Sequence, residues 1–365
     1  MTNRERLERC FDRAEQGEAL TLGFFGGSIT MGSLASSDEK CYCCLVCEWW
    51  KERFPGAEIA CVNGGIGGTD SLFGVSRVNE DLLMYRPDLV VVDFSVNDEA
   101  TLFCQETFEG LLRRILTAPS APAVIVLNNV FYDTGESAQD LHNAVAAHYG
   151  IGSVSIRDTI WKMVRDGRIR REEISPDGLH PNDRGHRMVA DEIIRYLDKV
   201  SEGRTADASV RASLCAPQTD QLPEPLTADR YEKAVRLNIT DSCPELMGFR
   251  ADAAEKMGHR DFFRNGWTGR RLGERIRFQA ECSCIAVQYR KTIDHPAPVA
   301  QLILDGDSAH PLILDANFGE TWGDCLYLQK VLDHGARKLH TVEIVISGTH
   351  ADDRKPFYLL SLITA

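Results

Sequence analysis

The chain has 365 residues, more than one hydrophobic core usually holds, so two domains are expected. Hydrophobic residues make up 43% and charged residues 26% of it, which is typical of a soluble globular protein. The formal net charge of -13 at pH 7 argues against nucleic acid or an anionic membrane as the main partner. No apolar run approaches the ~18 residues of a transmembrane helix, and residues 1–19 contain no apolar signal segment. We therefore expect a cytoplasmic protein.

Twelve cysteines are spread along the chain, and four of them fall within residues 41–47. In a reducing compartment cysteines remain free thiols, and buried ones pack as small apolar residues. The four lie in a stretch with helical periodicity, and no second pair follows at the spacing of a zinc site. We therefore expect packing roles for the cysteines, no metal site and no cofactor.

Five short apolar runs occur in residues 1–200, with helical stretches between them. Strands that alternate with helices form a parallel sheet with helices on both faces. The third run is apolar almost throughout, which is typical of a central strand. Residues 1–200 are therefore predicted to form a doubly wound α/β domain. Its strands are expected at residues 20–25, 57–62, 89–94, 123–127 and 153–156.

The chain changes character after residue 200. Residues 201–229 are rich in Ser, Asp, Ala, Pro and Thr and show little periodicity, which predicts a linker. Beyond it, short alternating runs are separated by Gly, Asp and His residues. This pattern predicts an antiparallel, jelly-roll-like β-sandwich over residues 230–365. We expect this accessory domain to bind carbohydrate, or to complete the active site or an interface.

Four segments at or after the ends of predicted strands carry glycine or polar residues. They are GGSIT at 26–30, NGGIGGT at 63–69, SVND at 95–98 and DGLHPND at 177–183. The first three follow parallel strands and therefore lie at one edge of the sheet, where open α/β sheets bind ligands. The fourth follows the last strand and can fold back over this edge.

The residues in these segments suit acyl transfer, which needs a nucleophile, a base, a group that orients the base and donors for an oxyanion. Ser28, on a strand-to-helix turn, can supply the nucleophile and a backbone donor. His180 can accept the proton of Ser28, and Asp177 can fix the tautomer of the imidazole. An amide of the glycine loop and the Asn97 side chain can supply two more donors. Each feature alone has an ordinary explanation as a turn, a cap or a surface histidine, but the four in this order favour a catalytic site.

These segments resemble the four blocks of the SGNH hydrolases, also called the GDSL esterase and lipase family. The resemblance covers about residues 18–200 and implies a flavodoxin-like fold with five parallel strands. It also implies that Ser28 is the nucleophile, His180 the base and Asp177 the partner of the base. The oxyanion donors that it implies are Ser28, Gly68 and Asn97.

The sequence departs from the family's pattern at one position and offers an alternative residue at two others. Gly27 stands where the family name implies aspartate, at a position that neighbours the nucleophile without acting in the chemistry. Gly68 matches the family's N-x-G-I-x-G pattern, although Gly65 lies in the same run of glycines. His186 is a second candidate base, but the Asp-x-x-His spacing selects His180, and we expect His186 to cap or pack the following helix.

The family hydrolyses esters of very different acids and alcohols, so the substrate must be inferred from other features. A member with an appended β-sandwich and no long apolar lid resembles bacterial carbohydrate acetylesterases, which implies O-acetyl groups on oligosaccharides as substrates. Phe131 and Tyr132 follow a strand at the same sheet edge and are expected to close the acyl pocket behind an acetyl group.

The predicted sandwich carries aromatic residues that can stack on a sugar ring, although aromatic residues in a sandwich more often fill its core. They are Trp267, Tyr289, Trp322 and Tyr327.

Two other functions remain open. A lysophospholipase or thioesterase would use the same triad beside a long apolar tunnel. A non-catalytic glycan-binding protein would use the sandwich alone, but the presence of Ser28, Asp177 and His180 together argues against it. The sequence identifies neither the sugar nor the acetylated position, and it allows a homo-oligomer.

Overall fold

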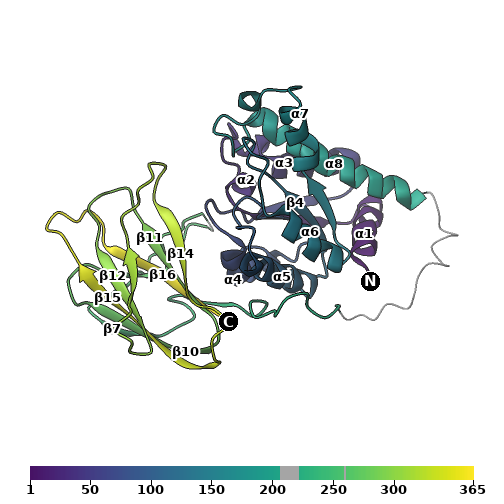
Figure 1. The fold of residues 1–365 in the computed structure, drawn as a ribbon. Helices are drawn as coiled ribbons and strands as arrows, with labels where there is room; N and C mark the ends of the chain where they lie inside the picture. Colours follow the sequence, from purple (N-terminus) through teal and green to yellow (C-terminus); the bar gives the residue numbers. More distant parts are fainter. Residues whose placement is uncertain (206–221, 259) are drawn as a thin grey trace. The chain divides into compact units, whose positions relative to one another are not determined.

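The computed structural model describes residues 1–205, 222–258 and 260–365. It consists of two compact units, Met1–Glu232 and Lys233–Ala365 (Figure 1). All helices in the described part of the chain belong to the first unit, and the strand pairs of the second unit are antiparallel.

A five-stranded parallel sheet forms the centre of the first unit. Its strands are β1 (Leu20–Gly26), β2 (Ile59–Asn63), β3 (Leu89–Asp93), β4 (Ala123–Asn128) and β5 (Gly152–Ser155). They lie in the order β2-β1-β3-β4-β5, which confirms the predicted flavodoxin-like fold. Because all pairs are parallel, the carboxyl ends of the strands share one edge of the sheet.

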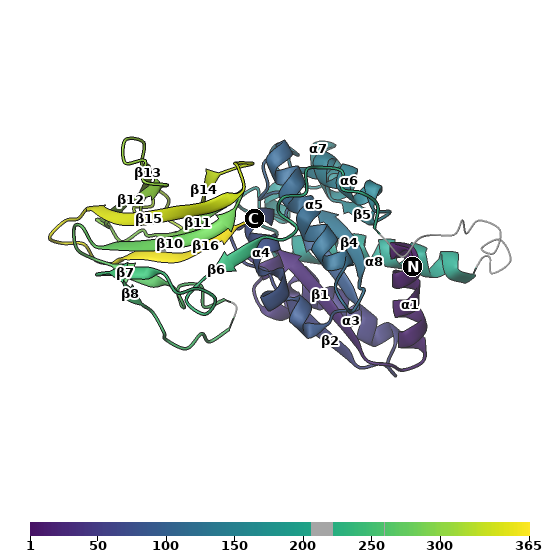
Figure 2. The same ribbon diagram turned by 90° about the horizontal axis from the view of Figure 1, so that it is seen from below.

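Helices cover both faces of this sheet, and for that reason β3 and β4 are apolar and buried along almost their whole length (Figure 2). The helices are α1 (Asn3–Glu15), α2 (Ser28–Met31), α3 (Tyr42–Arg53), α4 (Ser71–Asp81), α5 (Leu102–Leu116), α6 (Gln139–His148), α7 (Lys162–Arg165) and α8 (Asp183–Thr205). α1, α3 and α8 share one core with the sheet, whereas α4, α5 and α6 pack against one another on the opposite face.

Two antiparallel sheets make up the second unit and form the predicted β-sandwich. Their strands are β6 (Val235–Leu237), β7 (Glu245–Met247), β8 (Arg250–Ala251), β9 (Trp267–Gly269), β10 (Arg275–Cys282), β11 (Ile285–Lys291), β12 (Val299–Leu304), β13 (Leu312–Asp315), β14 (Cys325–Leu332), β15 (Lys338–Gly348) and β16 (Phe357–Thr364). One sheet has the order β13-β12-β15-β10-β7 and the other β14-β11-β16-β9-β8, and β6 also pairs with β16. Trp267 packs edge-to-face on Phe278 of the other sheet within a shared core.

The cysteine-rich stretch forms the start of α3. Cys41, Cys43 and Cys47 are buried there as free thiols, in agreement with a packing role. Among the described residues, no group of histidine, cysteine and acidic side chains is arranged to hold a metal ion. No helix in residues 1–205, 222–258 or 260–365 is both long and apolar enough to cross a membrane.

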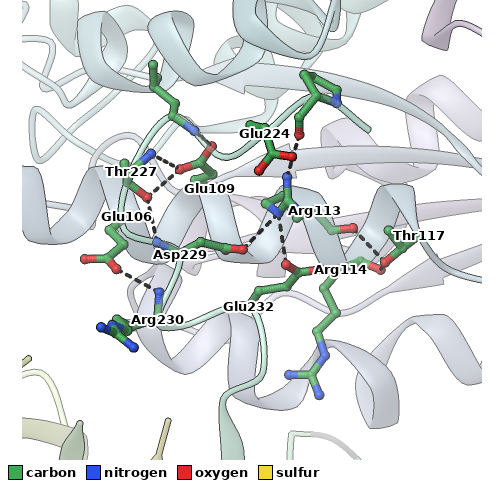
Figure 3. A network of polar contacts seen from close by, with 12 residues as sticks. Glu106, Glu109, Arg113, Arg114, Thr117, Glu224, Thr227, Asp229, Arg230 and Glu232 are labelled. Carbon is green, nitrogen blue, oxygen red and sulfur yellow. Dashed lines mark hydrogen bonds and ion pairs between the residues drawn. The ribbon is translucent and has the colours of Figure 1, made fainter. Parts of the chain in front are cut away.

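The segment expected as a linker, residues 201–229, begins within α8, and its residues 206–221 lie outside the described residues. From residue 222 to Glu232 the chain belongs to the first unit and lies along α5 (Figure 3). We call residues 222–232 the docking segment.

Charged residues of α5 hold the docking segment. Glu109, which is buried, accepts hydrogen bonds from the backbone N–H groups of Leu226 (2.6 Å) and Thr227 (2.7 Å). Arg113 forms ion pairs with Asp229 (3.2 Å) and Glu232 (2.9 Å) (Figure 3). Burial raises the pKa of Glu109, but the hydrogen bonds it accepts outweigh burial and leave that pKa below its ordinary value.

Glu109→Ala should lower the free energy of unfolding of the first unit by about 2–4 kcal/mol, because two partly buried backbone donors of the docking segment would lose a charged acceptor. Urea unfolding followed by circular dichroism at 222 nm measures this unit, since the described helices all lie in it. Glu48→Ala is the matched control, because the Glu48 side chain is 56% exposed in its pair with Lys51. Equal loss in both variants would contradict the role assigned to Glu109.

Candidate active site

Ser28 is the first residue of α2 and follows Gly26, the last residue of β1, and Gly27, which precedes the helix. A side chain at Gly26 would overlap the Asp93 carbonyl and the Thr30 hydroxyl, and one at Gly27 would overlap the Asn97 carboxamide. Only glycine therefore lets the chain turn here with these neighbours in place. The sharp turn presents the Ser28 side chain at the carboxyl edge of the sheet.

Ser28, His180 and Asp177 form a continuous chain of hydrogen bonds. Ser28 Oγ lies 2.8 Å from His180 Nε2, and His180 Nδ1 lies 2.7 Å from Asp177 Oδ2. The carboxylate selects the tautomer with the proton on Nδ1, which leaves Nε2 as an acceptor facing the serine hydroxyl. The structure thus brings Ser28 next to His180, which lies 152 positions later in the sequence, and His180 next to Asp177, three positions before it.

The loop that carries Asp177 and His180 is fixed by its own hydrogen bonds. Asp177 Oδ1 accepts from the backbone N–H groups of Leu179 (3.0 Å) and His180 (2.8 Å). The N–H of Tyr132 donates to the Gly178 carbonyl at 2.7 Å and ties this loop to the loop that follows β4. Burial raises the pKa of Asp177, but the hydrogen bonds from His180 and the two N–H groups outweigh it, so the pKa is lowered. Asp177 is therefore a carboxylate at neutral pH.

The glycine loop after β2 lies directly beside Ser28. A side chain at Gly65 would overlap the backbone of Thr30 and Met31, and a Cβ at Gly67 would lie 3.6 Å from Ser28 Cβ. Gly68 has a φ of 67°, in the left-handed region that favours glycine. Among the hydrogen bonds of the described residues, none uses the N–H of Ser28 or Gly68.

Asn97 lies in the turn after β3, where its backbone N–H donates to the Phe94 carbonyl at 3.0 Å. Its carboxamide packs over Gly27, next to Ser28. In the described part of the chain, Asn97 Nδ2 has no acceptor. Asn97, Ser28 and Gly68 thus carry three N–H donors that no described group uses.

Three further residues from the sequence prediction also have defined positions. Phe131 is 38% exposed, whereas the Tyr132 side chain is buried at 1% exposure. His186 is buried as well, and its two ring nitrogens bond to the backbone N–H of Tyr42 (3.4 Å) and the carbonyl of Ser33 (3.2 Å). Burial lowers the pKa of His186, so it is a neutral packing residue, as expected, and does not face Ser28.

A buried acid beneath the Ser28 turn was not predicted. Asp93 ends the otherwise apolar strand β3, and its Oδ2 accepts from Thr30 Oγ1 (3.2 Å) and Asn129 Nδ2 (2.9 Å). Tyr42 O–H completes the chain by donating to Thr30 Oγ1 at 2.8 Å. Burial raises the pKa of Asp93 to about 7, although these two donors lower it. One ionisable residue at the end of a wholly apolar run was the available sequence signal.

Arg77 of α4 is a second residue that the sequence analysis missed. It is wholly buried and donates to the carbonyls of Gly64 (2.7 Å) and Gly26 (3.1 Å). It also pairs with Asp81 at 3.0 Å and lies over the Phe25 ring. Arg77 thus holds the glycine loop against the end of β1.

Comparison with known proteins gives a family and two solved structures that are similar to this chain. The GDSL-like lipase/acylhydrolase family matches residues 24–188. The crystal structure of a two-domain esterase (CEX) active on acetylated mannans is 47% identical to this chain, with a TM-score of 0.93, and the match covers 98% of this chain and 94% of that one. A structure of such an esterase co-crystallized with mannopentaose is 46% identical, with a TM-score of 0.92 and the same coverage. No curated protein sequence matches the chain.

The chain therefore belongs to the GDSL-like lipase/acylhydrolase family, as its four sequence segments predicted. It is a carboxylic ester hydrolase, and its similarity to a two-domain esterase extends over both units.

Gly27→Ala should lower kcat by about 10²-fold and change KM little, because the new methyl group displaces the Asn97 carboxamide from its position beside Ser28. Gly27 has a φ of -89°, so alanine meets no backbone strain there. Steady-state kinetics on p-nitrophenyl acetate measures both constants. Gly56→Ala is the control, because a Cβ there would meet only Gly17 Cα, at 3.9 Å. Unchanged kcat in Gly27→Ala would show that the carboxamide position is unimportant.

Asp93→Asn should reduce the pH dependence of stability. The pKa of Asp93 rises from 3.8 to about 7 on folding, so the folded state binds the proton more tightly and the free energy of unfolding falls as pH rises through this window. The neutral asparagine, whose Oδ1 can still accept from Thr30 and Asn129, should remove on the order of 2–4 kcal/mol of that fall.

Urea unfolding at pH 5 and pH 8, followed at 222 nm, compares Asp93→Asn with the wild type. Asp198→Asn, at an exposed pair with Arg53, is the control and should keep the wild-type pH dependence. Identical pH dependence in Asp93→Asn and the wild type would show that Asp93 does not titrate in this window.

Proposed function

We propose that this protein is a carbohydrate acetylesterase that removes O-acetyl groups from acetylated manno-oligosaccharides. The hydrogen-bonded chain from Ser28 through His180 to Asp177 is the observation that carries this proposal. It supplies a nucleophile, a base and a carboxylate partner in one continuous line.

Acylation begins when Ser28 Oγ attacks the acetyl carbonyl carbon and His180 Nε2 takes the hydroxyl proton. The C=O π electrons move onto the carbonyl oxygen, and the imidazolium forms beside the Asp177 carboxylate. The oxyanion then accepts from Ser28 N–H, Gly68 N–H and Asn97 Nδ2, the three donors without a described partner. As the carbonyl re-forms, the sugar oxygen leaves with the proton from His180.

Deacylation repeats these steps with water. His180 takes a proton from the attacking water, the oxyanion returns to the same donors, and Ser28 Oγ leaves with the proton. Acetate and the free enzyme result, and no cofactor takes part in either half of the reaction.

The relatives support the substrate class. The esterase at 47% identity acts on acetylated mannans, and a structure of such an esterase was obtained with mannopentaose. Of the four sandwich aromatics considered for sugar stacking, Trp267 and Tyr289 are buried in the core and Tyr327 is partly buried against it, whereas Trp322 is 62% exposed. Trp322 packs edge-to-face on Phe318 with ring centroids 5.0 Å apart, which holds an aromatic face toward solvent. It is the aromatic residue we assign to sugar contact.

Phe131 remains the candidate wall for the acyl group because its side chain is partly exposed at the end of β4. The buried Tyr132 supports the loop of Asp177 and His180 through its backbone N–H. A lysophospholipase or thioesterase would need a long apolar acyl site and therefore the opposite chain-length preference. A glycan-binding protein without catalysis would release no acetate. The cytoplasmic location and a homo-oligomer stay predictions, which cell fractionation and light scattering would test.

Acetate release from acetylated manno-oligosaccharides tests the proposed function. The wild type should release acetate, and Ser28→Ala should lower kcat by ~10³-fold or more because it lacks the nucleophile. Acetylated xylo- and chito-oligosaccharides serve as competing substrates. Ser33→Ala is the control, because Ser33 bonds His186 only through its carbonyl. Residual activity near the wild type in Ser28→Ala would rule out the acyl-enzyme route.

A p-nitrophenyl ester series from two to eight carbons separates acetylesterase from the lipid alternatives. Each added methylene must displace packed side chains at ~1–3 kcal/mol, so kcat/KM should fall from acetyl to butyryl and nearly vanish at octanoyl. A maximum at six or eight carbons would instead favour a lysophospholipase or thioesterase.

A further inference from the structure

Asp98 follows Asn97 in the sequence and has no part in the mechanism above, yet its carboxylate is completely buried. Its Oδ1 accepts the backbone N–H of Ser71 at 2.8 Å, and its Oδ2 lies 2.9 Å from His142 Nε2. The side chains of Asp98 and His142 are 0% and 1% exposed. A buried carboxylate is costly unless it is bonded, so these two partners fix where the carboxylate lies.

Ser71, one partner, begins α4 just after the glycine loop. Ser71 lies three residues after Gly68. Between them, Thr69 Oγ1 donates back to the carbonyl of Ile66 in the glycine loop at 2.7 Å. Asp70 caps the helix by accepting from Phe73 N–H at 3.0 Å. A fixed Ser71 N–H therefore fixes the end of the loop that presents Gly68.

On the other side, Asp98 belongs to the turn that presents Asn97. The N–H groups of Asn97 (3.0 Å) and Asp98 (2.9 Å) both donate to the Phe94 carbonyl. Because both N–H groups bond to the same carbonyl, Asn97 and Asp98 cannot move independently of each other. The position of the Asp98 carboxylate thus also sets the position of Asn97.

His142 holds the carboxylate from α6. Its ring stacks on Phe108 of α5, with centroids 3.6 Å apart and planes at 5°. Asp70 is the other acid facing this group, and burial together with the Asp98 charge raises the pKa of Asp70 to about 7. Asp98 is therefore connected to the glycine loop, the Asn97 turn and the helical layer at once.

We propose that Asp98 is a positioning residue that sets the spacing between the oxyanion donors Gly68 N–H and Asn97 Nδ2. It does so by tying the loop after β2 to the loop after β3 through Ser71 N–H. The proposal rests on the proposed function, because these donors act in ester hydrolysis. A donor misplaced by about 1 Å costs ~10²-fold in rate, and the loss falls on kcat because the oxyanion exists only in the transition state and intermediate.

Two substitutions at Ser71 separate its N–H from its side chain. Ser71→Pro removes the N–H that bonds Asp98, whereas Ser71→Ala keeps it and removes only the hydroxyl bond to Thr107. Proline is favoured at the first position of a helix, and Asp70 has φ -97° and ψ 179°, the extended conformation that a residue before proline needs.

In the full chain, Ser71→Ala should keep kcat on p-nitrophenyl acetate within about threefold of the wild type. Ser71→Pro should lower kcat by ~10–10²-fold and leave KM within about threefold. The affinity of Ser71→Pro for methylboronic acid, which forms a tetrahedral anion on a serine oxygen, should fall by the same factor as its kcat. Inhibition by acetate, a ground-state ligand, should not change.

A second pair covers the case that Ser71→Pro does not fold. Asp98→Asn keeps an oxygen that accepts from Ser71 N–H, so its kcat should stay within tenfold of the wild type. Asp98→Leu keeps the side-chain volume but has no acceptor, so its kcat should be at least tenfold lower than that of Asp98→Asn. Thermal melting gives the folded fraction of each variant, and each measured kcat is divided by that fraction. Equal kcat per folded molecule within both pairs, or a change in KM alone, would overturn the proposal. An inactive wild type, or a fully active Ser28→Ala, would instead overturn the proposed function on which it rests.

Discussion

The pairing of β1 with β2 on one side and β3 on the other is the constraint on which the site depends. Phe24 of β1 pairs with Asn63, and Gly26 pairs with Asp93, so the three strands end almost level. The pairing continues past the strands, because Ile66 N–H donates to the Gly26 carbonyl at 3.0 Å. The glycine loop therefore extends the sheet, and its backbone lies directly against the backbone of the Ser28 turn. Residues with a Cβ could not approach so closely.

This close approach buries polar backbone groups inside the first unit, and buried side chains form hydrogen bonds with them. Arg77 donates to two carbonyls of the converging loops, while Asp93 and Asp98 accept from hydroxyl, amide and backbone donors. Such groups are costly to bury without partners, and well bonded they hold one arrangement of the loops. Oxyanion stabilisation requires donors that are in place before charge develops, so rigidity beneath the loops would serve the proposed ester hydrolysis.

The sequence predicted the features that depend on local pattern or on covalent order. Runs such as 89–94 are apolar because they are covered on both faces, and that pattern alone located the sheet and, through it, the shared edge of Ser28 and Asn97. The buried network escaped prediction because its partners are distant in sequence. Nothing near Glu109 indicates that it accepts from Leu226 and Thr227, and a polar segment such as 222–232 has the composition of a linker even when it is bound to a helix.

The Asp-x-x-His spacing alone does not identify a catalytic histidine, because a nucleophile must also lie beside the imidazole. Asp307 and His310 repeat the spacing in the second unit with an Nδ1–Oδ2 distance of 3.0 Å, against 2.7 Å for Asp177 and His180. The His310 side chain is 84% exposed, and its described contacts include no serine hydroxyl. His142 has an equally good carboxylate partner in Asp98, but it is buried against Phe108 and its Nδ1 meets no partner among the described residues. An imidazole–carboxylate pair thus becomes a base only where the fold places a nucleophile at the second nitrogen and leaves room for a substrate. At His180 the turn after β1 brings Ser28 Oγ within 2.8 Å of Nε2, and the His180 side chain is 23% exposed.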